Sequence, residues 1–288
     1  MTKILEIKNL SKYYKDFSLE NINLSLDRGY IMGFIGPNGA GKSTTIKLIM
    51  NLINKDSGEI KVFGLDNKAN EIEIKEKIGF VYDESYYYED LTILQMKKII
   101  SKFYKNWDDD TFYKYVKTFN LPIKKKIKDL SKGMKMKFSL SVALSHQAEL
   151  LIMDEPTAGL DPLVRSELLD ILMELIQDER KGILFSTHIT SDLDKVADYI
   201  TMIHEGEIIL QMPKDDIFEQ YGIVKGRKEL LDEHTRPFFI GIKENDFGFE
   251  GLIRDKNQCK KVFGENIIME KPNLEDIMLF FTRGGRDA

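Results

Sequence analysis

The segment from Gly36 to Ser43 constrains the fold more than any other part of the sequence. It reads GPNGAGKS and lies between a short apolar run, 30–35, and a run with helical spacing, 43–52. Its glycines allow backbone N–H groups to turn toward one point without interference from a Cβ atom. The following helix would direct the positive end of its dipole at the same point. This order of strand, glycine-rich loop and helix predicts an α/β fold with a phosphate-binding loop.

The side chains of this loop suit a nucleoside triphosphate. Lys42 is expected to reach the β- and γ-phosphates of ATP, and Ser43 offers a hydroxyl to Mg²⁺. The predicted nucleotide contacts are Gly36, Pro37, Asn38, Gly39, Ala40, Gly41, Lys42, Ser43, Thr44 and Thr45. The alternative is a glycine-rich turn without a ligand. Because the whole pattern arises by chance in about one chain of this length in a hundred, the phosphate site is favoured.

A second segment, Leu150 to Glu155, is an apolar run that ends in two carboxylates. The carboxyl ends of parallel strands form the edge of a sheet at which ligands bind. This is the Walker B pattern, in which Asp154 would hold Mg²⁺ through water and Glu155 would polarise the water that attacks the γ-phosphorus. Taken alone, the segment fits a strand with a polar end equally well. The phosphate loop decides in favour of the catalytic interpretation.

Hydrophobic spacing indicates how the rest of the chain is organised. Strand-like and helix-like runs alternate along most of it, which predicts a parallel sheet. Between about residues 84 and 147, apolar residues recur at three- and four-residue spacing, which predicts a helical insert. After Tyr221 the pattern weakens to one strand-like run, 238–242, and a helix that begins near Asn273. We therefore expect one large domain and a small appendage, over residues 1–220 and 221–288.

Composition narrows the function classes and the location. The chain has 47 acidic and 42 basic residues and a net charge of -5, which argues against nucleic acid as a partner. Its single cysteine, Cys259, fits a reducing compartment. The first residues lack the pattern of a secretory signal, and no segment approaches the 18 apolar residues of a membrane span. We expect a cytoplasmic protein, and any role that it has at a membrane would depend on a partner.

Four further elements resemble those of one family. Leu130 to Met134 reads LSKGM and resembles the LSGGQ signature of the ABC ATPases. Gly159 to Pro162, which includes Asp161, is similar to the family's D-loop, and His188 stands where the switch histidine is expected. Tyr14 resembles the aromatic residue that stacks on adenine. Because these elements follow one fixed order, the chain is identified as a member of this family over roughly residues 3 to 220.

The resemblance implies a P-loop NTPase fold, with a RecA-like parallel sheet core, an N-terminal antiparallel β subdomain and an inserted helical subdomain. It implies a head-to-tail dimer, in which Ser131 and Gly133 of one chain contact the γ-phosphate held by the other. His188 would hold that phosphate and the attacking water in register. Each residue has another interpretation by itself: Ser131 could be a helix cap, His188 could be structural, and Tyr13 could stack as well as Tyr14.

The sequence departs from the family at two places. Asp83 stands where the family has the glutamine of the Q-loop, and we expect its carboxylate to reach Mg²⁺. Lys132 and Met134 replace the first glycine and the glutamine of the signature. These departures resemble those of ATP-binding subunits of bacterial exporters for drugs and antibiotic peptides. The aromatic and acidic run 85–90 follows, where the family receives its permease, and packing within the helical insert explains it equally well.

These observations predict an ATP-binding and ATP-hydrolysing subunit of an ABC transporter. Its expected partners are a separate integral membrane permease and a second ATPase subunit, identical or different, and no nucleic acid. Such a chain would lie on the inner face of the cell membrane through the permease, and would serve export. The alternative is a soluble ABC ATPase that acts on nucleic acid or ribosomes. The chain has one phosphate loop and no long heptad repeats between Lys42 and Asp154, and both features favour the transporter.

Overall fold

The computed structural model describes residues 2–82 and 87–283. Its centre is a six-stranded sheet with the order β10-β9-β3-β8-β7-β6. The strands are β3 (Ile31–Ile35), β6 (Ile78–Val81), β7 (Leu150–Asp154), β8 (Gly182–Thr187), β9 (Tyr199–His204) and β10 (Glu207–Pro213). Neighbours from β9 to β6 are parallel, whereas β10 is antiparallel to β9. Every residue of β3, β7 and β8 is buried, as in parallel sheets covered on both faces.

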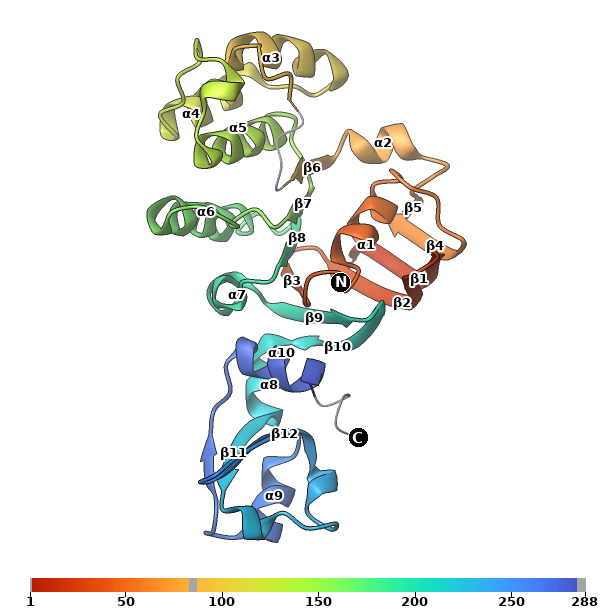
Figure 1. The fold of residues 1–288 in the computed structure, drawn as a ribbon. Helices are drawn as coiled ribbons and strands as arrows, with labels where there is room; N and C mark the ends of the chain where they lie inside the picture. The colour runs from red at the N-terminus through yellow and green to blue at the C-terminus, as the bar shows by residue number, and fades with distance from the viewer. Residues whose placement is uncertain (1, 83–86, 284–288) are drawn as a thin grey trace.

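A second, antiparallel sheet has the order β2-β1-β4-β5. It consists of β1 (Lys3–Tyr13), β2 (Ser18–Asp27), β4 (Ser57–Val62) and β5 (Leu65–Asp66), and α2 (Glu71–Lys75) follows it in the chain. One apolar cluster joins this sheet to α1 (Lys42–Ile49) and to one face of the central sheet. Figure 1 shows α1 and the antiparallel sheet together on one side of the central sheet. The predicted fold class, including the N-terminal antiparallel subdomain, is confirmed.

The other helices of this part lie on the opposite side of the central sheet or beyond its end. α6 (Pro162–Leu175) and α7 (Thr190–Val196) lie beside the sheet, across from α1 (Figure 1). The predicted insert contains α3 (Ile93–Ile100), α4 (Asp109–Thr118) and α5 (Lys132–Ser145), with 3₁₀ turns at Ser101–Phe103 and Ile127–Asp129. Thr92 begins α3 with a capping box shared with Gln95. The expected start of the insert, near residue 84, lies outside the described residues.

The C-terminal part contains more structure than the sequence predicted. Its sheet, which we call the C-terminal sheet, has the order β12-β13-β11-β14, with every neighbouring pair antiparallel. Its elements are β11 (Gly222–Gly226), β12 (Phe239–Asn245), β13 (Gly248–Ile253), α9 (Lys256–Phe263), β14 (Ile268–Glu270) and α10 (Leu274–Arg283), with 3₁₀ turns at Lys228–Leu230 and Arg236–Phe238. The expectation of one strand was wrong. β13 is buried on both faces and carries two glycines, so it shows no alternation.

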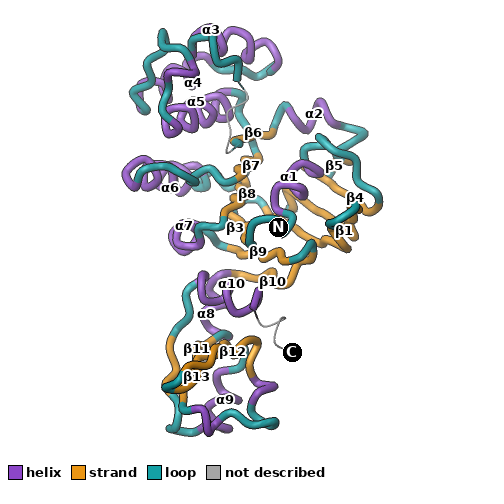
Figure 2. The backbone as a smooth tube through the Cα atoms, in the orientation of Figure 1, coloured by secondary structure: helices purple, strands orange, loops and turns teal. Residues whose placement is uncertain are grey.

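Apolar contacts continue from the central sheet into the C-terminal part. α8 (Lys214–Gln220) follows β10 directly and leads into β11. One buried cluster includes Leu193 and Val196 of α7 together with Ile277 and Phe280 of α10. Figure 2 shows α10 between α8 and the strands of the central sheet. The boundary expected at residue 220 stays a prediction, and it is crossed by this shared core.

Candidate functional site

The loop between β3 and α1 has a backbone that side chains would obstruct. Gly39 and Gly41 have φ angles of 81° and 116°, in the region that favours glycine. A Cβ atom at Gly36 would lie 2.2 Å from the carbonyl oxygen of Ile203 on β9. The buried Lys42 ammonium donates to the carbonyl oxygen of Gly36 at 2.7 Å, within the loop. The glycines therefore give this loop a backbone that suits the predicted phosphate cradle, and the Lys42 ammonium group lies against it.

The hydroxyl groups after Lys42 differ in their surroundings. Thr45 is fully buried, and its Oγ1 donates to the carbonyl oxygen of Gly41 at 2.9 Å. Its side chain thus stabilises the start of α1 rather than facing the loop. Ser43 is exposed, and its side chain forms a hydrogen bond with Asp154. Of the predicted hydroxyl contacts, Ser43 is the one that the structure joins to a carboxylate.

Asp154 ends β7 and is almost fully buried. The Oγ of Ser186, on the neighbouring strand β8, donates to its Oδ1 at 3.0 Å. Burial raises the pKa of Asp154, although the hydrogen bonds from Ser43 and Ser186 act in the opposite direction. A cation beside this carboxylate would stabilise its charged form. The oxygens of Asp154 and Ser43 thus form a pair of hard ligands at the sheet edge.

Glu155 lies between the phosphate loop and His188. Its Oε1 is 3.5 Å from Nζ of Lys42, and its Oε2 is 2.8 Å from Nδ1 of His188. The backbone N–H of His188 also donates to Oε2, at 3.2 Å. Glu155 has a φ angle of 50°, a conformation that costs about 1–3 kcal/mol and persists where the surroundings enforce it. The structure therefore brings together three predicted residues, which directly follow β7, directly follow β8 and begin α1.

Tyr14 is connected to the phosphate loop through a residue that the sequence analysis missed. Its ring stacks on Phe17, with centroids 6.4 Å apart, and Nζ of Lys12 lies 5.4 Å from its centroid. A Cβ atom at Gly41 would lie 3.1 Å from Cζ of Phe17. Tyr13 is exposed as well, but this stacked pair involves Tyr14. The signal available in the sequence was the spacing of two aromatic residues three positions apart.

The signature residues lie at the start of α5, against α6. Ser131 caps α5, and its Oγ accepts a hydrogen bond from the N–H of Met134 at 3.2 Å. A Cβ atom at Gly133 would lie 3.2 Å from Val164, so α6 closely approaches α5 here. Asp161 caps α6 and accepts hydrogen bonds from the N–H groups of Leu163 and Val164, both at 3.1 Å. Within the described chain, neither Ser131 nor Gly133 forms a hydrogen bond with the loop residues.

An ion pair that the sequence analysis missed joins the helices after Asp161 and His188. Arg165 of α6 donates from Nε to Asp192 of α7, which is 1% exposed, and also contacts the hydroxyl of Ser191. Removing one partner from such a buried pair is costly. This contact therefore fixes the relative position of the two segments that carry Asp161 and His188. No local pattern in the sequence pairs residues 27 positions apart.

Several expectations concern residues near β6. Asp83, Ser85 and Tyr86 lie outside the described residues, so the predicted metal contact of Asp83 is not placed. Tyr87 packs its ring against Phe138 of α5, with centroids 4.8 Å apart, whereas Tyr88 is 69% exposed. The two described tyrosines of this run thus divide between the core and the surface.

Within residues 2–82 and 87–283, no group of three or more His, Cys, Asp and Glu side chains is arranged to hold a metal ion. A cation at Asp154 and Ser43 would therefore take oxygens from a phosphate ligand and from water, as Mg²⁺ commonly does. None of the described helices combines the length and hydrophobicity needed to cross a lipid bilayer.

Comparisons with known proteins agree with this geometry. A family model described as "ABC transporter" matches residues 19–158, and one described as "AAA domain, putative AbiEii toxin, Type IV TA system" matches residues 126–192. The bacitracin transport ATP-binding protein BcrA of Bacillus licheniformis is 31% identical over 99% of this chain and 99% of its own length. That match includes the C-terminal part.

Two further similarities each cover about three quarters of the chain. The lantibiotic transport ATP-binding protein SrtF of Streptococcus pyogenes is 35% identical over 74% of this chain and 92% of its own. A solved structure of an ATP-binding subunit of an ABC transporter is 30% identical, with a TM-score of 0.69 over 75% of this chain and 92% of its own. Transport ATPases thus match better than the alternative of an ATPase that acts on nucleic acid or ribosomes. The chain belongs to the ABC transporter family, as a subunit that binds and hydrolyses ATP.

Proposed function

We propose that the chain powers the export of a drug or an antibiotic peptide through a separate membrane permease. The observation that carries this proposal is the junction of Lys42, Glu155 and His188, which fits ATP hydrolysis. The full-length similarity to a protein named for bacitracin transport supports the class of substrate. A second relative, named for lantibiotic transport, points to the same class.

In this proposal Lys42 exchanges its hydrogen bonds to the loop carbonyls for bonds to the β- and γ-phosphates of ATP. Glu155 orients a water molecule for attack on the γ-phosphorus and accepts its proton as the bond to the β–γ bridging oxygen breaks. His188, already bonded to Glu155, holds the water and the γ-phosphate in register. Tyr14 stacks on the adenine ring, and the contact between the Tyr14 and Phe17 rings holds Tyr14 in position.

Ser43 and Asp154 would hold Mg²⁺, and Asp83 would join them, as the sequence predicted. The ion would neutralise charge that develops on the phosphate oxygens. The buried Asp154 suits this role because a nearby cation offsets the cost of keeping its carboxylate charged away from water.

The signature residues would act on a second subunit. Ser131 and Gly133 start a helix of 14 residues, and a helix start supplies N–H donors and a positive dipole end for an anion. We propose that they contact the γ-phosphate bound by the phosphate loop of a partner ATPase, in a head-to-tail dimer. Hydrolysis would then separate the two subunits and move the permease to which they are bound. The chain would accordingly lie on the inner face of the membrane through that permease.

Reconstitution tests this function. The chain would be purified with the polytopic membrane protein that accompanies it and placed in vesicles loaded with a labelled bacitracin-type or lantibiotic peptide. Movement of the peptide should require ATP and stop in the Glu155→Gln variant, while Glu174→Gln, an exposed residue of α6, should leave it unchanged. Peptide movement that occurs without ATP and is unchanged in the Glu155→Gln variant would rule out this role.

A further inference from the structure

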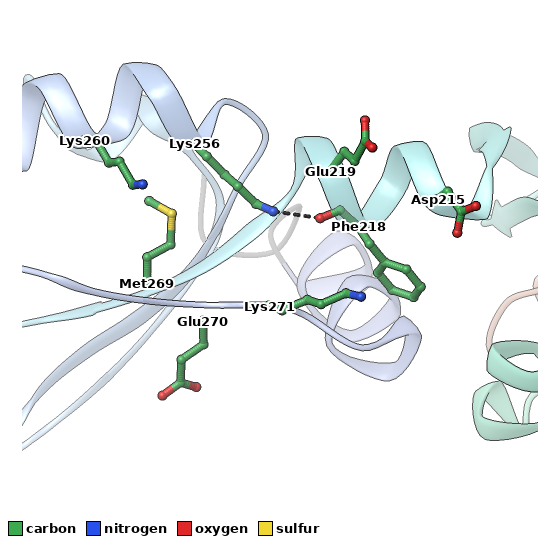
Figure 3. A pocket seen from close by; sticks show the side chains of 8 residues that line it. All are labelled: Asp215, Phe218, Glu219, Lys256, Lys260, Met269, Glu270 and Lys271. Carbon is green, nitrogen blue, oxygen red and sulfur yellow. Dashed lines mark hydrogen bonds between the residues drawn. The ribbon is translucent and has the colours of Figure 1, made fainter.

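A pocket of about 650 Å³ lies in the C-terminal part, between α8, α9 and β14. Phe218 of α8 and Met269 of β14 supply its apolar lining. Three lysines, Lys256 and Lys260 of α9 and Lys271 after β14, also line it (Figure 3). The phosphate loop and the carboxylates of the ATPase site have no part in this pocket.

Two of the lysines are held at the same point of α8. Nζ of Lys256 donates to the backbone carbonyl oxygen of Phe218 at 2.7 Å. Nζ of Lys271 lies 4.6 Å from the centroid of the Phe218 ring. An ammonium group has three N–H donors, so Lys256 keeps two for another acceptor. Figure 3 shows the Lys256 ammonium group at the Phe218 carbonyl oxygen and the Lys271 ammonium group beside the Phe218 ring.

The lining of the pocket contains three lysines and three carboxylates, those of Asp215, Glu219 and Glu270, so the placement of these groups decides which ligand it fits. Among the described residues, none of the three ammonium groups lies within 4.0 Å of a carboxylate oxygen, whereas Glu270, which also lines the pocket, is bonded to Lys225 at 2.7 Å. In Figure 3 the carboxylates of Glu219 and Glu270 extend away from the space between the lysines. In the part of the chain that the structure describes, the three lysines of the pocket thus have no carboxylate at ion-pair distance, although carboxylates are as numerous in the lining.

The pKa of Lys256 reflects these surroundings. Burial lowers its pKa, and the charges of Lys271 and Lys260 lower it further, although Glu219 acts in the opposite direction. Like charges held together raise the free energy of this part of the fold. A bound anion would reverse that effect, because it attracts all three groups at once.

We propose that this pocket binds a phosphate monoester, with its phosphate on Lys256 and Lys271 and its organic part against Phe218 and Met269. Lys256 begins α9 and Lys271 directly follows β14, and both ammonium groups contact Phe218 of α8. A phosphate bound to both would therefore join α9 and β14 to α8. The volume suits a small organic phosphate, and the two apolar side chains suit a carbon skeleton.

Such a ligand would connect the two parts of the chain. α8 directly follows β10 of the central sheet, and Lys214 at its start donates to the carbonyl oxygen of Asp194 in α7. Fixing α8 on α9 and β14 therefore restrains the C-terminal sheet relative to the helix that follows His188. Since the ligand binds the folded chain, thermal stability should also rise with the logarithm of its concentration once the site is saturated.

Glycerol 1-phosphate is the first probe, and binding is measured by calorimetry on the full chain with Lys42→Ala, which disables the ATPase phosphate loop. We expect saturable binding that weakens at least about tenfold in Lys256→Gln/Lys271→Gln. The control, Lys228→Gln/Lys261→Gln, removes the same charge from exposed positions of the same part and should bind as its parent does. Circular dichroism checks that each variant is folded.

Vesicles containing phosphatidic acid, compared with phosphatidylcholine alone, distinguish the source of the phosphate. Binding to the former that depends on Lys256 and Lys271 assigns a lipid headgroup, and binding of glycerol 1-phosphate alone assigns a free ester. No saturable binding of either probe, or equal loss in the control pair, overturns the proposal. If the double variant fails to fold, Lys271→Gln alone changes an exposed residue, and unchanged affinity in that variant is equally decisive.

Discussion

The carboxyl edge of the central sheet and the C-terminal sheet place polar groups in opposite ways. At the edge, each short segment sets the positions of its own polar groups: Asp154 and Glu155 are adjacent, and Gly41 precedes Lys42. Their positions follow from strand ends and from a backbone with positive φ at Gly41 and Glu155. The geometry is set locally, by conformations that few residues accept.

In the C-terminal part, the lysines of the pocket come from separate elements, and none of the three has a positive φ angle. They meet because an apolar cluster that includes Val224, Phe249 and Phe263 packs α9 on the sheet. The geometry at the carboxyl edge of the central sheet therefore depends on individual residues, whereas the geometry of the C-terminal pocket depends on the packing of many residues together.

Lys42→Ala should have the largest effect. We expect ATP affinity to fall about a thousandfold, or about 4 kcal/mol, because the ammonium group lies against the predicted phosphate cradle. Lys47→Ala, an exposed residue of the same helix, should bind ATP normally. Fluorescent-nucleotide titrations measure both. Equal affinities would show that the cradle does not depend on this residue.

Ile277→Ala tests whether packing joins the two regions. The fully buried Ile277 of α10 belongs to the cluster shared with α7, so its truncation should lower the free energy of unfolding by about 3 kcal/mol. Urea unfolding should show this loss in the transition of the whole chain. Phe247→Ala, at a hairpin tip that is 96% exposed, should change stability by less than about 0.5 kcal/mol. Two separate transitions, with one unaffected, would instead indicate independent units.

Ser131→Ala should have a smaller effect on stability and a specific effect on pairing. Losing the cap of α5 costs about 1 kcal/mol. In light scattering, Glu155→Gln chains with Mg-ATP should pair, and adding Ser131→Ala should weaken pairing about tenfold. Asp108→Ala removes the cap of α4 and provides a control of similar cost. Equal loss of pairing in the Ser131→Ala and Asp108→Ala variants would mean that Ser131 acts only by stabilising its helix.

Asp83→Gln should have the smallest effect. If Asp83 helps to hold Mg²⁺, the concentration needed for half-maximal hydrolysis should rise about threefold. With the metal chelated, ATP should bind more tightly to this variant, because a carboxylate near the phosphates has been removed. Asp90→Asn, at an exposed position, serves as control. Unchanged curves for both quantities would remove Asp83 from the metal site.

The sequence predicted the elements that a short stretch of residues determines by itself. It missed the contacts between residues that are distant in the sequence. β3, β7 and β8 were recognisable as compact apolar runs because both faces of each are buried. β11 and β14 have five and three residues, too few for any period to appear. Phe17 and the Arg165–Asp192 pair were missed for a related reason, since their contacts depend on neighbours brought close by the fold.

Glu155→Gln tests most directly whether Glu155 orients the attacking water beside Lys42 and His188. Gln keeps the size of the side chain and removes the carboxylate, so binding and hydrolysis should separate. ATP titration and phosphate release would be measured on this variant and on the wild type. We predict ATP affinity within about threefold of wild type and phosphate release at least about a hundredfold slower. Phosphate release close to the wild-type rate would show that Glu155 does not orient the attacking water.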